Sequence, residues 1–110
     1  MQDRVETNDP VLAEIVKRLQ REFAPLRIYL FGSQARGEAG EHSDYDLMVV
    51  VDHRTAPMHK LAQRAHALMW DLGVSTDILV WGREEFDGRV HLRASLPSRV
   101  LDEGRVLYAA

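Results

Sequence analysis

The first part of the chain has the hydrophobic pattern of an amphipathic helix. Apolar residues recur three or four positions apart from Val11 to Phe23, so one face of the helix would be buried. The Asn-Asp pair at residues 8–9 offers an N-cap, and Pro10 suits the first helical position. Pro25 cannot continue a helix, so we expect this first element to end just before it.

Three short apolar runs are typical of β-strands. They cover residues 26–31, 44–51 and 74–81. The second run ends in three consecutive valines, which indicates burial on both faces of a sheet. Residues 106–108 predict a further short strand.

The remaining segments predict helices. Residues 33–40 suit a turn followed by a short helix, and residues 58–72 carry an apolar stripe that ends at Gly73, where a C-cap glycine is expected. Residues 83–103 are weakly helical, and we expect a break at Pro97. The order α-β-α-β-α-β with a helical tail predicts an α+β fold, a small mixed β-sheet with helices packed against it.

Composition places this pattern in one domain. The chain has 110 residues, of which 45% are hydrophobic, and no linker or repeat divides it, so we expect a single domain over residues 1–110. The absence of cysteine excludes disulfides, thiolate metal sites and cysteine nucleophiles. The net charge of -3 gives no general attraction to nucleic acid, and we expect no direct nucleic-acid binding. Residues 1–10 are polar, and neither a signal peptide nor a membrane span is predicted. We therefore expect a cytoplasmic protein.

A glycine-serine pair follows the first predicted strand. Gly32 allows close approach of the backbone, and Ser33 can cap the next helix or donate to a phosphate oxygen. Helix N-termini of this kind bind phosphate, because their free N–H groups and the helix dipole both favour anions. Arg36 lies one turn further on and can reach the same anion.

Acidic residues mark the next two predicted strands. Asp44 and Asp46 are two positions apart on one strand, so we expect their carboxylates on the same face. Two carboxylates this close repel each other unless a cation lies between them. Hard oxygen ligands of this kind suit Mg²⁺. Asp77 lies in the following strand, and it completes a three-carboxylate site if the two strands are neighbours. A phosphate-binding turn beside metal-binding acids is typical of phosphoryl or nucleotidyl transfer.

These residues resemble the signature of the polymerase-β-like nucleotidyltransferase superfamily, and in particular its minimal nucleotidyltransferase (MNT) branch. In that signature Gly-Ser is followed, after ten residues, by Asp-x-Asp, and this chain has the same spacing. The matching residues are Gly32-Ser33, Ala35-Arg36-Gly37 and Ser43-Asp44-Tyr45-Asp46-Leu47. The resemblance extends to the order of the elements and to residues 102–108.

The resemblance implies the roles of the site residues. Asp44, Asp46 and Asp77 would be catalytic and would hold two Mg²⁺ ions. Gly32 and Ser33 would bind the β- and γ-phosphates of a nucleotide, with Arg36 as a helper.

The resemblance also implies a function. An MNT antitoxin would transfer AMP from ATP to a tyrosine of a cognate HEPN toxin, and the two proteins would form a hetero-oligomer. The short chain leaves little room for an acceptor, which also favours a partner protein. Two alternatives stay open: an antitoxin that neutralises its partner by binding alone, and a nucleotidyltransferase that acts on a small hydroxyl-bearing molecule. The base of the donor cannot be read from the sequence.

Other apolar residues have structural interpretations. Trp70 and Trp81 are expected in the core or at the edge of an interface. Four apolar positions of the tail are expected to cover the sheet: Leu92, Leu96, Val100 and Leu101.

Overall fold

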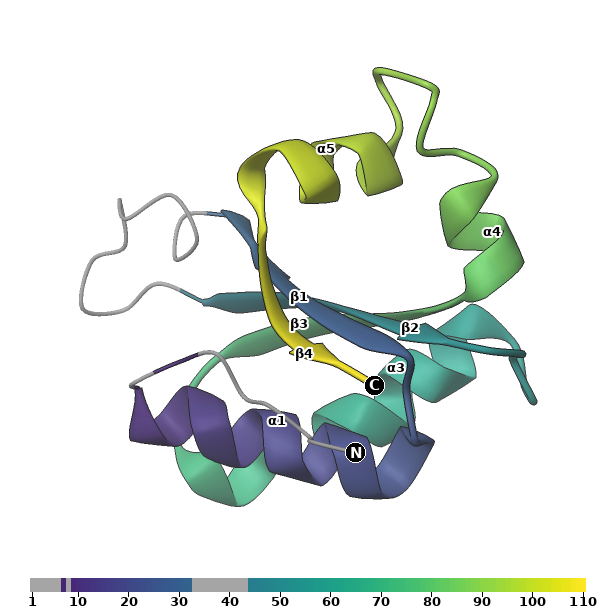
Figure 1. Cartoon of the computed structure of the whole chain (residues 1–110). Coiled ribbons are helices and arrows are strands. Elements are labelled where there is room, and N and C mark those ends of the chain that lie inside the picture. Colours follow the sequence, from purple (N-terminus) through teal and green to yellow (C-terminus); the bar gives the residue numbers. More distant parts are fainter. Residues whose placement is uncertain (1–6, 8, 33–43) are drawn as a thin grey trace.

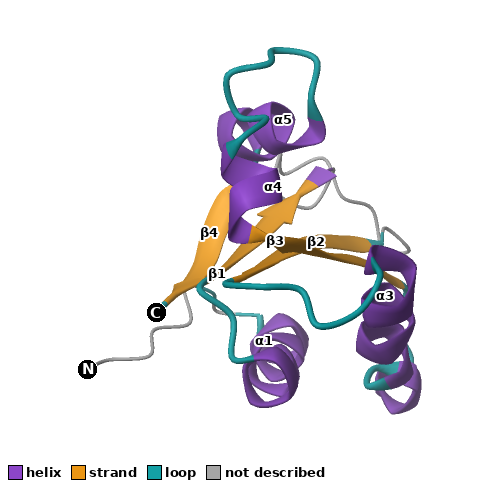
Figure 2. Ribbon diagram, turned by 90° about the vertical axis from the view of Figure 1, so that its right-hand side faces the viewer, coloured by secondary structure: helices purple, strands orange, loops and turns teal. Residues whose placement is uncertain are grey.

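A mixed four-stranded sheet carries helices on both faces. The computed structural model describes residues 7, 9–32 and 44–110. The helices are α1 (Pro10–Phe23), α3 (Met58–Ala67), α4 (Arg83–Asp87) and α5 (Leu96–Glu103), with a 3-10 turn η1 (Trp70–Leu72). The strands are β1 (Arg27–Phe31), β2 (Tyr45–Val51), β3 (Thr76–Gly82) and β4 (Arg105–Ala109). Helices α1 and α3 lie on one face of the sheet, and α4 and α5 lie on the other (Figures 1 and 2).

The sheet confirms the predicted α+β class and the four predicted strands. Its strand order is β3-β2-β1-β4, in which β2 runs antiparallel to β1 and parallel to β3. Residues 47–51 of β2 are all buried, which confirms the burial predicted for the three valines at the end of this strand. The short helix predicted at residues 33–40 lies outside the described residues. No helix in the described part of the chain is long and apolar enough to cross a membrane.

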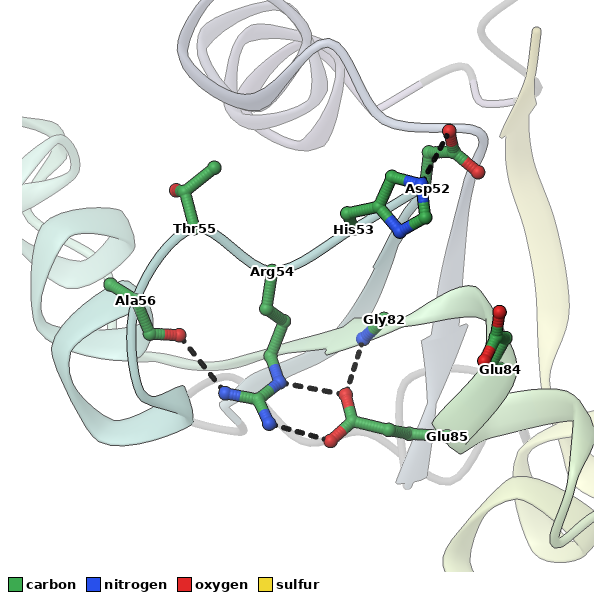
Figure 3. Close-up of a pocket in the computed structure, with 8 residues that line it drawn as sticks. All are labelled: Asp52, His53, Arg54, Thr55, Ala56, Gly82, Glu84 and Glu85. Carbon is green, nitrogen blue, oxygen red and sulfur yellow. Dashed lines mark hydrogen bonds and ion pairs between the residues drawn. The ribbon is translucent and has the colours of Figure 1, made fainter.

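Ion pairs and hydrogen bonds join the segments that follow β2 and β3. Two nitrogens of Arg54 donate to the carboxylate of Glu85 at 2.7 and 2.6 Å, and a third donates to the Ala56 carbonyl at 3.0 Å (Figure 3). The same carboxylate accepts from the backbone N–H of Gly82 at 2.9 Å. The Arg54 guanidinium holds the pKa of Glu85 below its ordinary value. This network fixes the start of α4 against the loop after β2.

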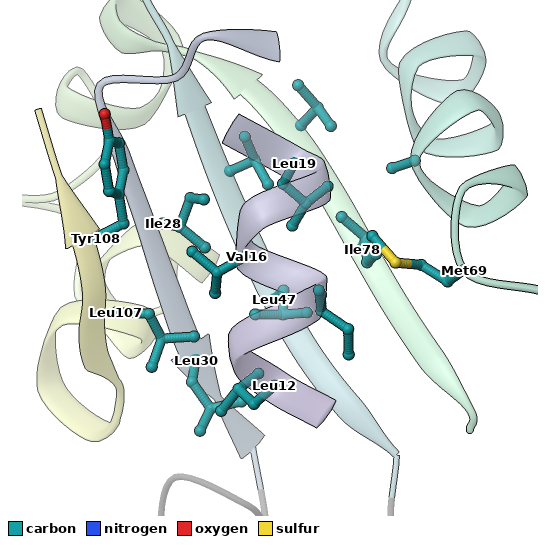
Figure 4. Close-up of a cluster of buried hydrophobic side chains, with 14 of the residues drawn as sticks. Leu12, Val16, Leu19, Ile28, Leu30, Leu47, Met69, Ile78, Leu107 and Tyr108 are labelled. Carbon is teal, nitrogen blue, oxygen red and sulfur yellow. The ribbon is translucent and has the colours of Figure 1, made fainter. Parts of the chain in front are cut away.

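The larger part of the core lies between the sheet and the pair α1 and α3. Alternate residues of the strands point into it, as strand geometry requires. Figure 4 shows this cluster, in which Val16 and Leu19 of α1 pack over Ile28 and Leu47 of the sheet. A second cluster fills the opposite face: Tyr29, Met48, Val50, Phe86 of α4 and Val100 of α5. The sheet is therefore covered by apolar side chains on both sides.

Asp9 starts α1 and also ties it to the sheet. One oxygen of its carboxylate accepts from the N–H groups of Val11 and Leu12 at 2.9 and 3.3 Å, which confirms the N-cap. Its other oxygen accepts from the Tyr45 hydroxyl at 2.7 Å. Burial, together with this bond, raises the pKa of Tyr45 to about 12, so the hydroxyl stays protonated and donates at neutral pH. Asp9 therefore joins the start of α1 to the first residue of β2.

The third helix ends earlier than the apolar stripe predicted. It stops at Ala67, and the chain continues through η1 to Gly73, which takes a left-handed φ of 68°. Arg18 of α1 donates to the Leu68 carbonyl at 2.7 Å and pairs with Asp71 at 2.6 Å. An α-helix would use that carbonyl within its own hydrogen-bond ladder. The predicted stop at Gly73 is right, but the last turn is a 3-10 turn.

The tail differs from its prediction in two ways. Pro97 does not break a helix but lies in the first turn of α5, where its missing N–H costs nothing, and Ser95 caps that turn. Val100 is buried and Leu96 packs beside it, as predicted. Leu92 and Leu101, by contrast, are 49% and 45% exposed, so they do not cover the sheet.

The two tryptophans have different environments. Trp81 is partly buried against the second cluster. The guanidinium carbon (Cζ) of Arg89 lies over the Trp81 ring, 5.7 Å from its centroid. Trp70 is 82% exposed, so the core interpretation is wrong for this residue. Of the two expectations for Trp70, only an interface stays open.

Replacing Tyr45 by Phe removes one hydrogen bond to a charged group. We expect Tyr45→Phe to lower the free energy of unfolding by about 1–2 kcal/mol, measured by urea denaturation. Asp9→Ser keeps a helix cap but has no second oxygen to accept from the Tyr45 hydroxyl, so it should cost a similar amount. The double variant should cost little more than either single one. Full additivity would show that the two groups are not coupled.

Glu85 makes stability depend on pH. A carboxyl whose pKa is lowered by folding stabilises the protein above its ordinary pKa of 4.5 and loses that contribution as the pH falls below it. We expect the urea midpoint of the wild type to fall between pH 6 and pH 3.5 by more than that of Glu85→Gln. The exposed neighbour Glu84→Gln serves as the control and should follow the wild type. Equal pH dependence in Glu85→Gln would contradict the assignment.

Candidate active site

Two acidic residues stand opposite each other in neighbouring strands. Asp46 of β2 pairs with Asp77 of β3 in the parallel ladder. Paired residues of adjacent strands point to the same face, and the strands lie about 4.8 Å apart. The two carboxylates therefore share one face, as predicted for neighbouring strands.

The acidic pair lies at one end of an otherwise apolar face. Met48 and Val50 follow Asp46 on this face, and both are buried in the cluster under α4 and α5. Leu79 follows Asp77 in the same way and packs against that cluster. Asp46 is half-buried and Asp77 is exposed. The apolar part of the face is thus closed, and its acidic end is reached by solvent.

Gly32 lies against the carboxylate of Asp46. Its φ of 74° is in the left-handed region, which favours glycine. A Cβ at this position would overlap Oδ2 of Asp46 and lie 3.1 Å from its Cγ. The group that lies against Gly32 is thus the Asp46 carboxylate, and the predicted approach of this backbone to a phosphate stays a prediction. Gly32 follows Phe31, which pairs with Asp46 across β1 and β2, so backbone pairing brings the two together.

Tyr45 holds the start of β2 from two sides. Its backbone N–H donates to the Ser75 carbonyl at 3.0 Å, and its hydroxyl donates to Asp9 at 2.7 Å. Because Tyr45 lies between Asp44 and Asp46, these bonds fix the segment that presents the acids. This role of Tyr45 was not predicted from the sequence, where the available signal was a tyrosine between two acids at the start of a strand.

Part of the predicted site cannot be placed. Ser33 and Arg36 lie outside the described residues. Asp44 is exposed and stands one residue before β2, so its common face with Asp46 stays a prediction. Within residues 7, 9–32 and 44–110, no three His, Asp or Glu side chains lie close enough together to hold a metal ion. The three-carboxylate set therefore also stays a prediction.

The acidic pair has the chemistry of a magnesium site. Mg²⁺ is commonly held by one or two carboxylates, with phosphate oxygens and water as its other ligands. Asp46 and Asp77 supply two hard oxygen ligands from rigid, paired strands. The glycine beside them leaves room for no side chain, so the turn keeps its backbone close to the acids. These residues fit such an ion together with a phosphate-bearing substrate.

A polar hollow of about 470 Å³ lies at the opposite end of the same strands. Asp52, Arg54, Gly82, Glu84 and Glu85 are among the residues that line it (Figure 3). The Arg54 and Glu85 side chains satisfy each other there, and Asp52 pairs with Arg83 at 3.1 Å. These groups are already engaged in holding the loop and α4 in place. The acidic end is therefore the better candidate for chemistry.

Comparison with known proteins agrees with this geometry. The model of the family described as the nucleotidyltransferase domain matches residues 12–107. A protein of Methanocaldococcus jannaschii named "putative protein adenylyltransferase" is 35% identical over 82 residues, which cover 74% of this chain and 77% of the relative.

Solved structures show the same fold. A chain in the crystal structure of a toxin–antitoxin with AMP-PNP is 25% identical, with a TM-score of 0.60, and the match covers 89% of this chain and 73% of that one. A chain in a variant of the toxin–antitoxin MntA–HpeT is 26% identical, with a TM-score of 0.60, and the match covers 90% and 72%. The family match spans both acidic strands and Gly32, so the chain belongs to the nucleotidyltransferase domain family and is a nucleotidyltransferase.

Proposed function

We propose that this nucleotidyltransferase is the antitoxin of a toxin–antitoxin pair and transfers AMP from ATP to a tyrosine of a HEPN-type toxin. The observation that carries the proposal is the pairing of Asp46 and Asp77 beside Gly32. A relative named as an adenylyltransferase of proteins supports a protein acceptor, and the toxin–antitoxin neighbours support a toxin as that protein. The neighbour with AMP-PNP supports ATP as the donor.

Different residues of the site would bind the nucleotide and face the acceptor. Asp44 and Asp46 would hold Mg²⁺ and the nucleotide, and Asp77 would hold Mg²⁺ on the side of the acceptor. Gly32 and Ser33 would bind the β- and γ-phosphates, with Arg36 beside them. When bound, Mg²⁺ neutralises phosphate charge and lowers the pKa of an oxygen nucleophile.

The reaction exchanges one bond of the α-phosphorus for another. The tyrosine oxygen forms a bond to the α-phosphorus, and the bond from this phosphorus to the bridging oxygen of the β-phosphate breaks. Pyrophosphate leaves, and the phenolic proton passes to water. The chain contributes orientation of the reacting groups. The strand pairing and the Tyr45 bonds hold the acids beside the place where the phosphates would bind.

The arrangement of the whole protein follows from this proposal. Residues 1–110 would act as one catalytic domain, and the partner would supply the acceptor within a hetero-oligomer. A toxin whose target is in the cytoplasm would place the pair there.

Removal of either acid should abolish transfer. With the toxin partner, Mg²⁺ and ATP labelled at the α-phosphate, we expect Asp46→Asn and Asp77→Asn each to lower the rate of labelling about 100-fold or more. Asp52→Asn, at the opposite end of β2, is the matched control and should label at the wild-type rate. Mass spectrometry of the labelled partner should locate AMP on tyrosine.

Two results would contradict the proposal. If the wild type labels no partner with any nucleotide, and the double variant Asp44→Ala/Asp46→Ala still neutralises the toxin, the chain is a binding antitoxin. If the wild type labels small hydroxyl-bearing molecules such as aminoglycosides and leaves the toxin unlabelled, the acceptor class is wrong.

Gly32 allows a paired test of the close approach. We expect Gly32→Ala to displace the Asp46 carboxylate and lower transfer by at least 10-fold, on the order of the effect of a misplaced catalytic group. Gly73 has a similar φ of 68° with nothing within 4 Å of an added Cβ. Gly73→Ala should therefore cost only the left-handed strain, about 1–2 kcal/mol, and leave transfer unchanged. Equal activity of the two variants would contradict the role of Gly32.

A further inference from the structure

The side of α3 that faces away from the sheet is open to solvent. Leu61 and Ala65 point inward and pack in the larger core cluster. His59, Gln63 and His66 are exposed, and they stand four and three positions apart, so they form one stripe along the helix. Figure 2 shows no described element over this outer side of α3.

Trp70 extends the stripe by one turn. It stands four positions after His66, and the chain between them stays helical, with Leu68 and Met69 in the αR region. Trp70 is 82% exposed, which leaves a large apolar area in water. Tryptophan is among the residues that most often anchor protein interfaces. The stripe therefore ends in a candidate anchor.

The backbone that carries Trp70 is held in place. Arg18 of α1 donates to the Leu68 carbonyl at 2.7 Å and to the Asp71 carboxylate at 2.6 Å. Met69, directly before Trp70, is buried in the core cluster. A side chain presented by a fixed backbone loses less conformational entropy on binding than one on a loose segment. Trp70 is therefore preorganised for contact with a partner.

A hollow of about 340 Å³ lies beside the stripe, between α3 and the start of β3. Ala62, Gln63, His66 and Ala67 form its α3 wall, so the stripe and the hollow share two residues. The hollow lies on the α3 face of the sheet and is separate from the acidic site. Its volume suits a single side chain of a partner that lies along the stripe.

The charge of this surface favours an acidic partner. Residues 53–70 contain six Arg, Lys or His residues and no Asp or Glu. On α3, Arg64 pairs with Glu22 at 2.6 Å, whereas Lys60 and His66 form no ion pair with any described residue. Such donors suit carboxylates. Nucleic acid is less suited, because several Lys or Arg side chains are needed to neutralise its phosphates.

The stripe ends at the same end of the sheet as the acids. The chain passes from Trp70 through Gly73 into β3, whose second residue is Asp77. The Asp46 and Asp77 carboxylates lie on the face opposite to α3. A protein bound along the stripe would therefore flank β3 and leave the acidic site uncovered.

We propose that this stripe, from His59 to Trp70, is a docking surface for an acidic helix of the partner protein. An apolar residue of that helix lies in the hollow, its carboxylates lie near Lys60 and His66, and it covers the Trp70 ring. A helix fits the stripe because its own side chains repeat with the same spacing over about three turns. The assignment rests on the proposed function for the identity of the partner, the toxin.

Removing the indole should weaken the complex and leave the chemistry intact. In an Asp46→Asn background, where transfer does not contribute, we expect Trp70→Ala to raise the Kd of the toxin at least 10-fold, measured by calorimetry. Leu92→Ala removes another exposed apolar side chain and is the matched control, expected within 2-fold of its background. In the active chain, Trp70→Ala should raise the KM for the toxin and change kcat and the KM for ATP less than 2-fold. Equal affinity of Trp70→Ala and Leu92→Ala overturns the assignment.

Charge reversal tests the acidic character of the partner. We expect Lys60→Glu to raise the Kd about 3-fold or more, because it places a carboxylate opposite carboxylates. Lys17→Glu makes the same change on an exposed position of α1 outside the stripe and should have a smaller effect. If the two variants bind the toxin alike, the partner helix is not acidic and the proposal is wrong.

Fluorescence separates the docking surface from the proposed function. In Trp81→Phe, Trp70 is the remaining tryptophan, and its emission should move to shorter wavelengths when the toxin binds. If the emission moves but no AMP is transferred, the proposed transfer fails and the docking surface stands. If the emission does not move with the toxin, the docking surface is overturned, whether or not AMP is transferred. A shift with single-stranded RNA in place of the toxin would overturn it as well.

Discussion

The pairing of β2 with both of its neighbours is the constraint on which the candidate site depends. Its antiparallel register with β1 sets Phe31 opposite Asp46 and so brings Gly32 against that carboxylate. Its parallel register with β3 sets Asp46 opposite Asp77. A slip of one residue in either pairing would turn one partner to the other face of the sheet. The buried residues 47–51 prevent such a slip, because apolar clusters enclose β2 on both faces.

The two ends of β2 and β3 have different roles. Opposite the acids, the charged groups are paired with one another, as Arg54 with Glu85, and they hold the loop and α4 in place. At the acidic end, the carboxylates of Asp46 and Asp77 stand on one face of the sheet, an arrangement that suits a bound cation. The apolar core between the ends supplies the stability that keeps the acids in place. Tyr45 adds a direct bond from this end to the cap of α1.

The sequence was informative where local chemistry decides the structure. Strand periodicity predicted β1 to β4, and Asp9 with Pro10 predicted the start of α1. Sequence patterns failed where a distant group is involved: beyond the end of α3, the Leu68 carbonyl accepts from Arg18, which is far away in the chain. The effect of Pro97 was predicted wrongly, because a proline that starts a helix and one that breaks a helix look alike in sequence. For the site, the spacing predicted the acids, but the pairing of Asp46 with Asp77 depends on a strand order that no local pattern contains.

In the part of the chain that the structure describes, no strand pairs with the outer side of β3, and this edge has a consequence for the behaviour of the protein in solution. An unpaired strand edge is a template on which a second copy can add its own strand, and natural sheets discourage this with a charged residue on the edge strand. In β3 that residue is Asp77, which is exposed. One carboxylate would then serve both to keep copies of the chain apart and to take part in the reaction. A variant of this chain that had lost the transfer activity would still need a charged residue, a bulge or a covering segment at this edge to resist aggregation.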